Sequence, residues 1–217
     1  MKTNFEERIF LMDNVWVNGI VYRLNRKNNT AKIVKVEEVY PVIVVPETVT
    51  DGADMFKVVS VETAVFHKLK DLRQVQLPST IIKIGRHAFS ECPNLEKIVC
   101  NNKQCMKIWN LAFAGCHSLT ELDISGEVIL ETNVFYNCRN IRQIKLHVVG
   151  DIVSGTFNGC PNLHELYFLS KKHIVINPNA IYYCPNLDTI HINGSVEDYA
   201  GILDLAYEGV SIRFANV

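Results

Sequence analysis

The chain has 217 residues, of which 48% are hydrophobic, so it can bury one continuous core in one or two domains. Lys plus Arg number 22 and Asp plus Glu number 23, which leaves the net charge close to zero. This balance argues against nucleic acid or an anionic membrane as a partner, because both attract a basic face.

No apolar stretch approaches the roughly 20 residues that cross a bilayer, so we expect no transmembrane segment. The first 14 residues carry three acids and only four consecutive apolar residues, which is unlike a secretory signal. We therefore expect either an intracellular protein or one whose export signal is missing from this sequence.

Residues 1–60 are predicted to form an N-terminal cap of β-hairpins followed by a first strand. Residues 15–36 alternate around two turn signals, Asn18-Gly19 and the "RKNNT" of residues 26–30, which indicates one or two hairpins. Residues 40–49 indicate an isolated strand that ends at a Val-Pro pair. Residues 51–61 indicate a turn and a strand that leads into the next region.

Six copies of a 17-residue pattern fill residues 61–192, and their starts are 22 to 24 residues apart. A clear copy is "IGRHAFSECPNLEKIVC" (84–100). Repeat position six is Phe66, Phe89, Phe113, Phe135, Phe157 and then Ile181. Repeat position nine is Leu69 and then Cys92, Cys116, Cys138, Cys160 and Cys184.

A unit of this length cannot bury a core alone, but stacked copies can if the same positions point inward at every level. Repeat positions twelve to seventeen end in period-two alternation, which indicates a strand with one buried face. One such strand per repeat predicts a parallel sheet along a solenoid. Positions one to nine predict a turn or a short helical turn on the opposite side.

The pattern A-F-x-x-C-x-x-L-x-x-I-x-I-P resembles the BspA-like (Treponema pallidum type) leucine-rich repeat. Residues 72–98, "LRQVQLPSTIIKIGRHAFSECPNLEKI", match it closely and include Pro78. The departures are Leu69 for Cys, Ile181 for Phe and the loss of proline after most strands. The resemblance implies a leucine-rich-repeat solenoid of the α/β horseshoe type, rich in β-structure and continuous as one domain.

Residues 193–217 are predicted to form a C-terminal cap. Residues 195–209 begin with Ser and acids and end with Gly, which predicts a short helix, and residues 210–217 predict a closing strand. A solenoid has an open core at each end that terminal units must cover. Because both ends suit this role, we expect the chain to be complete apart from any export signal.

All seven cysteines are predicted to be buried, free thiols. Five share repeat position nine, Cys100 takes position seventeen, and Cys105 stands three residues before an isoleucine, as Ile81 does. Neighbouring rungs lie about 4.8 Å apart with parallel side chains, which does not suit a disulfide. The seven histidines form no column, so we expect no metal or cofactor. Catalysis is disfavoured because the adjacent Cys116 and His117 would diverge in a turn.

The outward side chains of the six predicted strands form a candidate protein-binding surface on the concave wall. They are Gln74, Gln76, Lys97, Val99, Glu121, Asp123, Gln143, Lys145, Glu165, Tyr167, Thr189 and His191. One interpretation is a solvated face whose alternating charges pair across strands. The other is a protein-binding face with Tyr167 and His191 as anchors. Trp109, at repeat position two, either is an exposed contact or packs over a neighbouring loop.

The resemblance implies a non-enzymatic protein-binding module, at the cell surface or secreted, that adheres to host or matrix proteins. The alternative is an intracellular scaffold or regulatory module of the same fold, which the missing signal and the free thiols favour. An enzyme is disfavoured because the sequence has no G-x-S-x-G, P-loop or G-x-G-x-x-G motif. We therefore expect a protein partner of unknown identity, no cofactor and no nucleic acid.

Overall fold

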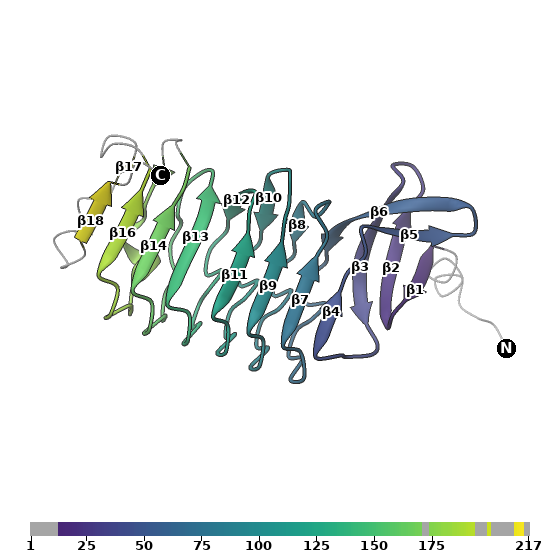
Figure 1. The fold of residues 1–217 in the computed structure, drawn as a ribbon, viewed down its shortest axis with the longest axis horizontal. Helices are drawn as coiled ribbons and strands as arrows, with labels where there is room; N and C mark the ends of the chain where they lie inside the picture. Colours follow the sequence, from purple (N-terminus) through teal and green to yellow (C-terminus); the bar gives the residue numbers. More distant parts are fainter. Residues whose placement is uncertain (1–12, 171–173, 194–198, 201–210, 215–217) are drawn as a thin grey trace.

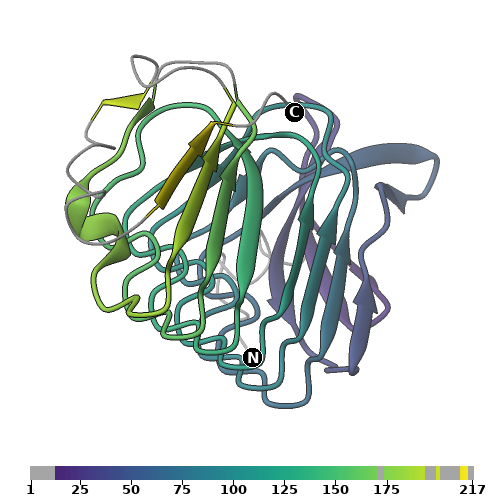
Figure 2. The same cartoon turned by 60° about the vertical axis from the view of Figure 1, so that its left-hand side comes forward.

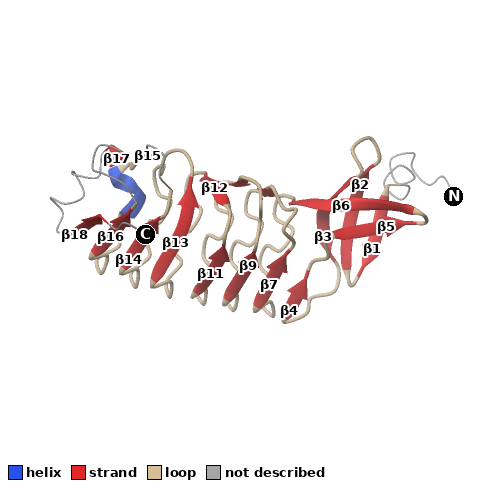
Figure 3. Cartoon of the chain, turned by 45° about the horizontal axis from the view of Figure 1, so that its top comes forward, coloured by secondary structure: helices blue, strands red, loops and turns tan. Residues whose placement is uncertain are grey.

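The chain folds as a β-solenoid whose coils stack along one axis (Figure 1). The structure is a computed structural model that describes residues 13–170, 174–193, 199–200 and 211–214. Strands dominate it (Figure 3), and the 3₁₀ helix η1 (Pro178–Ile181) is the one helix among the described residues. The predicted leucine-rich-repeat solenoid with a parallel sheet is confirmed.

Antiparallel hairpins precede the coils. Their strands are β1 (Asn14–Val17), β2 (Ile20–Asn25), β3 (Thr30–Val36), β5 (Thr48–Asp51) and β6 (Asp54–Val61). Asn18 and Gly19 make the first turn at positive φ, where the sequence has its turn signal. Because β6 runs parallel to β3 and also to the first short strand of the coils, the hairpins and the coils share one continuous sheet.

Each repeat contributes one strand to a parallel sheet that we call the long-strand sheet. Its strands are β4 (Val42–Val44), β7 (Gln74–Leu77), β9 (Lys97–Cys100), β11 (Glu121–Ile124), β13 (Gln143–Val148), β14 (Glu165–Phe168), β16 (Thr189–Ile192) and β18 (Ser211–Phe214). Alternate side chains such as Val75, Ile98 and Ile144 are buried, as the period-two alternation predicts. The strand expected within residues 40–49 is β4, which pairs with β7.

A second parallel sheet, absent from the sequence prediction, forms where each repeat begins. It contains the end of β6 followed by β8 (Lys83–Ile84), β10 (Met106–Ile108) and β12 (Glu127–Leu130). Farther along, Ile152 and Ile176 form a bridge, and β15 (Ile174–Val175) pairs with β17 (Tyr199–Ala200). Several coils therefore carry two strands rather than the single strand expected.

The chain connects these two sheets through tight turns that stack along one edge of the solenoid, which we call the turn ridge (Figure 2). Repeat positions four and eight there adopt positive φ in most repeats. These residues are Ala64, Lys68, His87, Glu91, Leu111, Gly115, Asn133, Asn137, Gly155, Gly159 and Tyr183. Backbone N–H groups of one turn donate to carbonyls of the next, as Phe113 N does to Val134 O at 2.9 Å.

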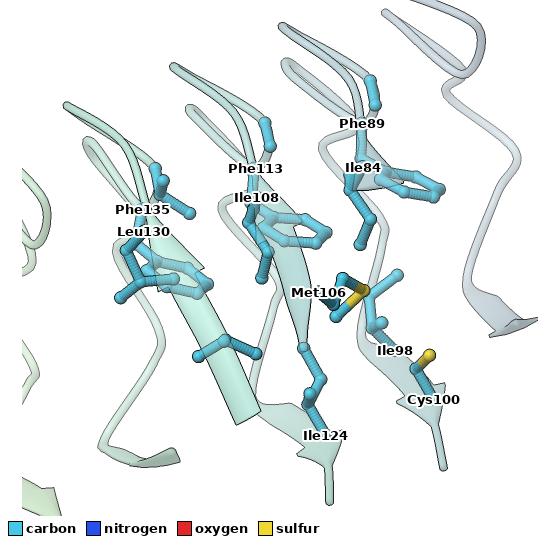
Figure 4. Close-up of a cluster of buried hydrophobic side chains, with 14 of the residues drawn as sticks. Ile84, Phe89, Ile98, Cys100, Met106, Ile108, Phe113, Ile124, Leu130 and Phe135 are labelled. Carbon is cyan, nitrogen blue, oxygen red and sulfur yellow. The ribbon is translucent and has the colours of Figure 1, made fainter. Parts of the chain in front are cut away.

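Two columns of identical side chains fill the core beside the turn ridge. The five phenylalanine rings of repeat position six are buried and stack nearly parallel, with neighbouring centroids 4.7 to 5.7 Å apart. Figure 4 shows three of them, Phe89, Phe113 and Phe135. Each thiol at repeat position nine donates to the phenylalanine carbonyl of the preceding repeat. Cys92 donates to Phe66 at 2.8 Å and Cys138 to Phe113 at 3.1 Å. The thiols therefore link successive coils, besides filling space.

Two sequence expectations need correction. None of the seven cysteines forms a disulfide, as predicted, but two of them are not buried. Cys184 is half-buried, and Cys105 is exposed because it lies in a seven-residue connection that is longer than most. The helix expected over residues 195–209 is contradicted at Tyr199–Ala200, which form β17. The rest of that segment lies outside the described residues. The expected closing strand contains β18, which pairs with β16.

The long-strand sheet is interrupted between β11 and β13, which do not pair. We call β4, β7, β9 and β11 the N-terminal block, and β13, β14, β16 and β18 the C-terminal block. β13 is six residues long because the chain continues beyond repeat position seventeen, where His147 and Val148 pair with β12 of the second sheet. The turn ridge and the phenylalanine column pass this level without a break, so they hold the two blocks together.

Candidate functional site

The outward side chains of the long-strand sheet form two rows, which together we call the strand face. The first row is Val42, Gln74, Lys97, Glu121, Gln143, Glu165, Thr189 and Ser211, and the second is Val44, Gln76, Val99, Asp123, Lys145, Tyr167, His191 and Arg213. The twelve predicted residues lie in these rows. All are exposed or half-buried except Thr189, which is buried. The sequence analysis missed the members from β4 and β18, because these strands lie outside the six repeats.

The N-terminal block of the strand face combines apolar side chains with an ion pair. Val42 and Val44 are 52% and 55% exposed, so β4 presents apolar surface to solvent. Lys97 pairs with Glu121 across β9 and β11, as the alternating charges predict, and hydrogen bonding to Glu121 raises the pKa of Lys97. Such an exposed pair is screened by solvent and adds little stability.

The C-terminal block carries four side chains that we call the Tyr167 cluster: Lys145, Glu165, Tyr167 and His191. The rings of Tyr167 and His191 stack with centroids 4.0 Å apart, and Lys145 Nζ lies 4.5 Å from the centre of the tyrosine ring. The Glu165 carboxylate accepts a hydrogen bond from the Tyr167 hydroxyl at 3.1 Å and lies 3.3 Å from His191 Nε2. Burial and this hydrogen bond raise the pKa of Tyr167.

The break between the two blocks opens a hollow of about 330 Å³ in the strand face. Its lining residues are Lys97, Thr120, Glu121, Leu122, Asp123, Gln143 and Lys145. Leu122 is half-buried, whereas the residue at the same repeat position in each of the other repeats is buried. The hollow therefore exposes an apolar side chain among polar and charged walls, which is a common arrangement in binding sites.

Trp109 lies beside the second sheet and does not belong to the strand face. It is 40% exposed, with Lys107 Nζ 4.5 Å and Lys83 Nζ 5.9 Å from the ring centre. Both lysines also pair with acids, Lys107 with Glu131 and Lys83 with Glu62. Of the two predictions for Trp109, the structure supports an exposed side chain over packing against a loop, and the two lysines make cation–π contacts with its indole ring.

The buried cysteines and the turn-ridge histidines lack the features of a catalytic site. Burial raises the pKa of Cys138 to about 12 and that of Cys92 to about 11, whereas a nucleophilic thiol needs a low pKa. Ser90 lies 2.8 Å from His67 Nδ1 and 3.2 Å from His87 Nδ1, but it is only 1% exposed. Over the described ranges, no three His, Cys, Asp or Glu residues are grouped to hold a metal ion.

The part of the chain that the structure describes contains no helix with the length and apolarity required to cross a membrane. A family model for a BspA type leucine rich repeat region, with six copies, matches residues 55–147 and 106–201. No curated protein matches the chain.

Several solved structures share this fold. A leucine rich cell surface protein from Faecalibacterium prausnitzii A2-165 is 24% identical, with a TM-score of 0.64 over 82% of this chain and 54% of that one. The Treponema pallidum leucine rich repeat protein is 19% identical, with a TM-score of 0.63 over 93% and 97%. A leucine-rich repeat protein from Bacteroides ovatus ATCC 8483 is 20% identical, with a TM-score of 0.57 over 83% and 55%. The chain thus spans about half the length of the first and third.

Proposed function

Because the chain belongs to the BspA type leucine-rich repeat family, we propose that it is a non-enzymatic module that binds a protein partner through the strand face. Repeat proteins use extended surfaces to which every repeat contributes a few side chains. The strand face has this form, since its two rows run across both blocks of the long-strand sheet.

The Tyr167 cluster is the observation that carries this proposal. Tyrosine is enriched at interface hot spots because it offers a large contact area with few rotatable bonds. Lys145, Glu165 and His191 hold the ring in one orientation before any partner arrives, so little side-chain entropy remains to be lost on binding.

The competing interpretation is a solvated face whose charges pair with one another. Lys97 and Glu121 fit it. Lys145 does not, because it lies over an aromatic ring rather than beside an acid. The exposed Val42 and Val44 also argue for a contact surface, since water solvates valine side chains poorly.

We further propose that the module acts at the cell surface or outside the cell, in adhesion to host or matrix proteins. The F. prausnitzii protein of the same fold is described as a cell surface protein, which supports this location. The alternative is a cytoplasmic scaffold or regulatory module, which the free cysteines favour. Immunoblots of surface, secreted and cytoplasmic fractions of the native cell decide between them, and a purely cytoplasmic signal would rule out adhesion.

Charge reversal on the strand face tests the binding surface. The test variant carries Lys97→Glu, Glu121→Lys, Asp123→Lys, Lys145→Glu and Glu165→Lys. The control variant reverses two basic and three acidic residues elsewhere, as Lys70→Glu, Arg139→Glu, Asp71→Lys, Glu91→Lys and Glu127→Lys. Each immobilised protein captures partners from native-cell and matrix extracts, and the retained proteins are quantified by mass spectrometry. We expect the test variant alone to lose the specific partner. Equal retention by both variants would refute the strand face as the binding surface.

A further inference from the structure

We propose that the C-terminal block binds an extended protein segment in which two acidic residues, four positions apart, flank an apolar residue. This inference rests on the proposed function and names the chemistry of the partner. Its basis is a row of four side chains on neighbouring strands, Lys145 on β13, Tyr167 on β14, His191 on β16 and Arg213 on β18. A cation thus occupies each end of the row, and two stacked rings lie between them.

The two cations at the ends of this row are available to a partner. Both Lys145 and Arg213 are exposed, and no described carboxylate forms an ion pair with either. Lys145 contacts the face of the Tyr167 ring, a cation–π contact that leaves an ammonium able to donate hydrogen bonds to a carboxylate. Anions are therefore favoured above the two ends of the row.

The centre of the row disfavours an anion and favours an apolar side chain. Glu165 lies in the adjacent row and already interacts with the Tyr167 hydroxyl and with His191 Nε2. A partner carboxylate placed above the rings would be repelled by Glu165. An aromatic or aliphatic side chain would instead pack against the outer edges of these two half-buried rings, because Lys145 and His191 already cover the faces of the Tyr167 ring.

The spacing of the row fits the geometry of an extended chain. Neighbouring strands of a sheet are about 4.8 Å apart, so three steps from β13 to β18 separate Lys145 and Arg213 by about 14 Å at the backbone. An extended segment advances about 3.3 Å per residue, which puts residues i and i+4 about 13 Å apart. Residues i, i+2 and i+4 also point to the same side. A segment lying across the strands would therefore place two acids over the cations and its central residue over the rings.

The N-terminal block does not offer this arrangement. The same row there consists of Val44, Gln76, Val99 and Asp123, with an acid and no cation. Lys97 belongs to the other row and pairs with Glu121. An acidic segment is therefore expected to select the C-terminal block, and the rest of a partner can contact the exposed valines of the N-terminal block.

A blocked heptapeptide of sequence Ser-Glu-Ser-Phe-Ser-Glu-Ser serves as the probe. It is titrated into ¹⁵N-labelled full-length protein, and amide chemical shifts are followed. We expect saturable shifts on β13, β14, β16 and β18. A peptide with Gln in place of both Glu, and a rearranged peptide Ser-Ser-Glu-Phe-Glu-Ser-Ser, are each expected to bind at least tenfold more weakly. Equal affinity for the three peptides, shifts located elsewhere, or no shift at millimolar peptide would overturn the inference.

Protein variants provide an independent check. The variant Lys145→Glu with Arg213→Glu is expected to weaken binding of the probe at least tenfold, whereas Lys70→Glu with Arg139→Glu, which changes the charge equally, is expected to leave it unchanged. The spectrum of each free variant reports whether it is folded. Suppose that the test variant with five charge reversals no longer captures the natural partner, but the three peptides bind equally well. This result would reject the acidic-segment inference alone. If the test variant with five charge reversals still captured the partner, the proposed function itself would be rejected.

Discussion

Replacement of Gly85 by alanine tests how closely successive coils are stacked. Gly85 lies at repeat position two, is buried, and its φ is outside the left-handed region, so alanine is allowed by the backbone. An added Cβ would lie 2.6 Å from the carbonyl carbon of Glu62 and 2.8 Å from the nitrogen of Thr63. Both atoms are backbone atoms of the preceding coil, so neither can rotate away, and the two coils must move apart.

The magnitude follows from two opposing effects. Overpacking a close contact costs about 1–3 kcal/mol, whereas glycine to alanine at an unstrained position gains about 0.4–1 kcal/mol from the unfolded state. We expect Gly85→Ala to lower the free energy of unfolding by roughly 1–2 kcal/mol, and Gly85→Val to lower it further. Urea denaturation followed by circular dichroism measures both values.

The sign of the change decides the outcome. If the coils were more widely spaced than the structure shows, Gly85→Ala would stabilise the protein instead. Gly52→Ala serves as the control, because no atom lies within 4 Å of the added Cβ there and φ is +63°. The free energy of unfolding of that variant should fall by about 1–2 kcal/mol, because alanine is strained in the left-handed conformation. This fall does not depend on the spacing between coils.

Three further outcomes are expected. Phe113→Ala should lower the free energy of unfolding, measured by urea denaturation, by about 3–5 kcal/mol, because the ring is fully buried between two others. A decrease below about 1 kcal/mol would contradict the stacked column. The free energy of unfolding should fall as pH rises from about 9 to about 12, and Cys138 should contribute about 1.4 kcal/mol per pH unit to this fall. The reason is that the folded thiol keeps a proton that the unfolded thiol releases. If Cys138→Ala showed the same slope of unfolding free energy against pH, Cys138 would not be its origin. A maleimide should label Cys105 rapidly and the half-buried Cys184 next. In the Cys105→Ser variant, rapid labelling of any of the fully buried cysteines would show that the core is open to solvent.

The long strands could be predicted from the sequence because their alternation is regular and recurs at one spacing. The repeat position of Cys100 is buried in every repeat, and that of Ile98 in every repeat except that of Leu122, because each coil must cover its neighbours. The short strands of the second sheet escaped prediction, since two to four residues such as Lys83–Ile84 are too few to show a period.

Three further features were not predicted from the sequence, each for a different reason. The cysteine column is visible in the sequence, but the bond from each thiol to a carbonyl depends on the distance between coils. The break beside β13 did leave a signal, because "QIKLHV" (143–148) continues its alternation beyond repeat position seventeen with no turn residue. The outward valines of β4 were missed because "VIVV" (42–45) contains no polar residue that would identify the exposed side.

The position of the partner on the surface can be measured by site-specific photocrosslinking in the native cell. A benzoylphenylalanine is introduced in place of Gln143, in the centre of the strand face, or in place of Ile129, which is exposed on the second sheet. We predict that the Gln143 position yields a crosslinked protein partner and that the Ile129 position yields none. A partner captured from Ile129 and absent from Gln143 would show that binding takes place away from the strand face.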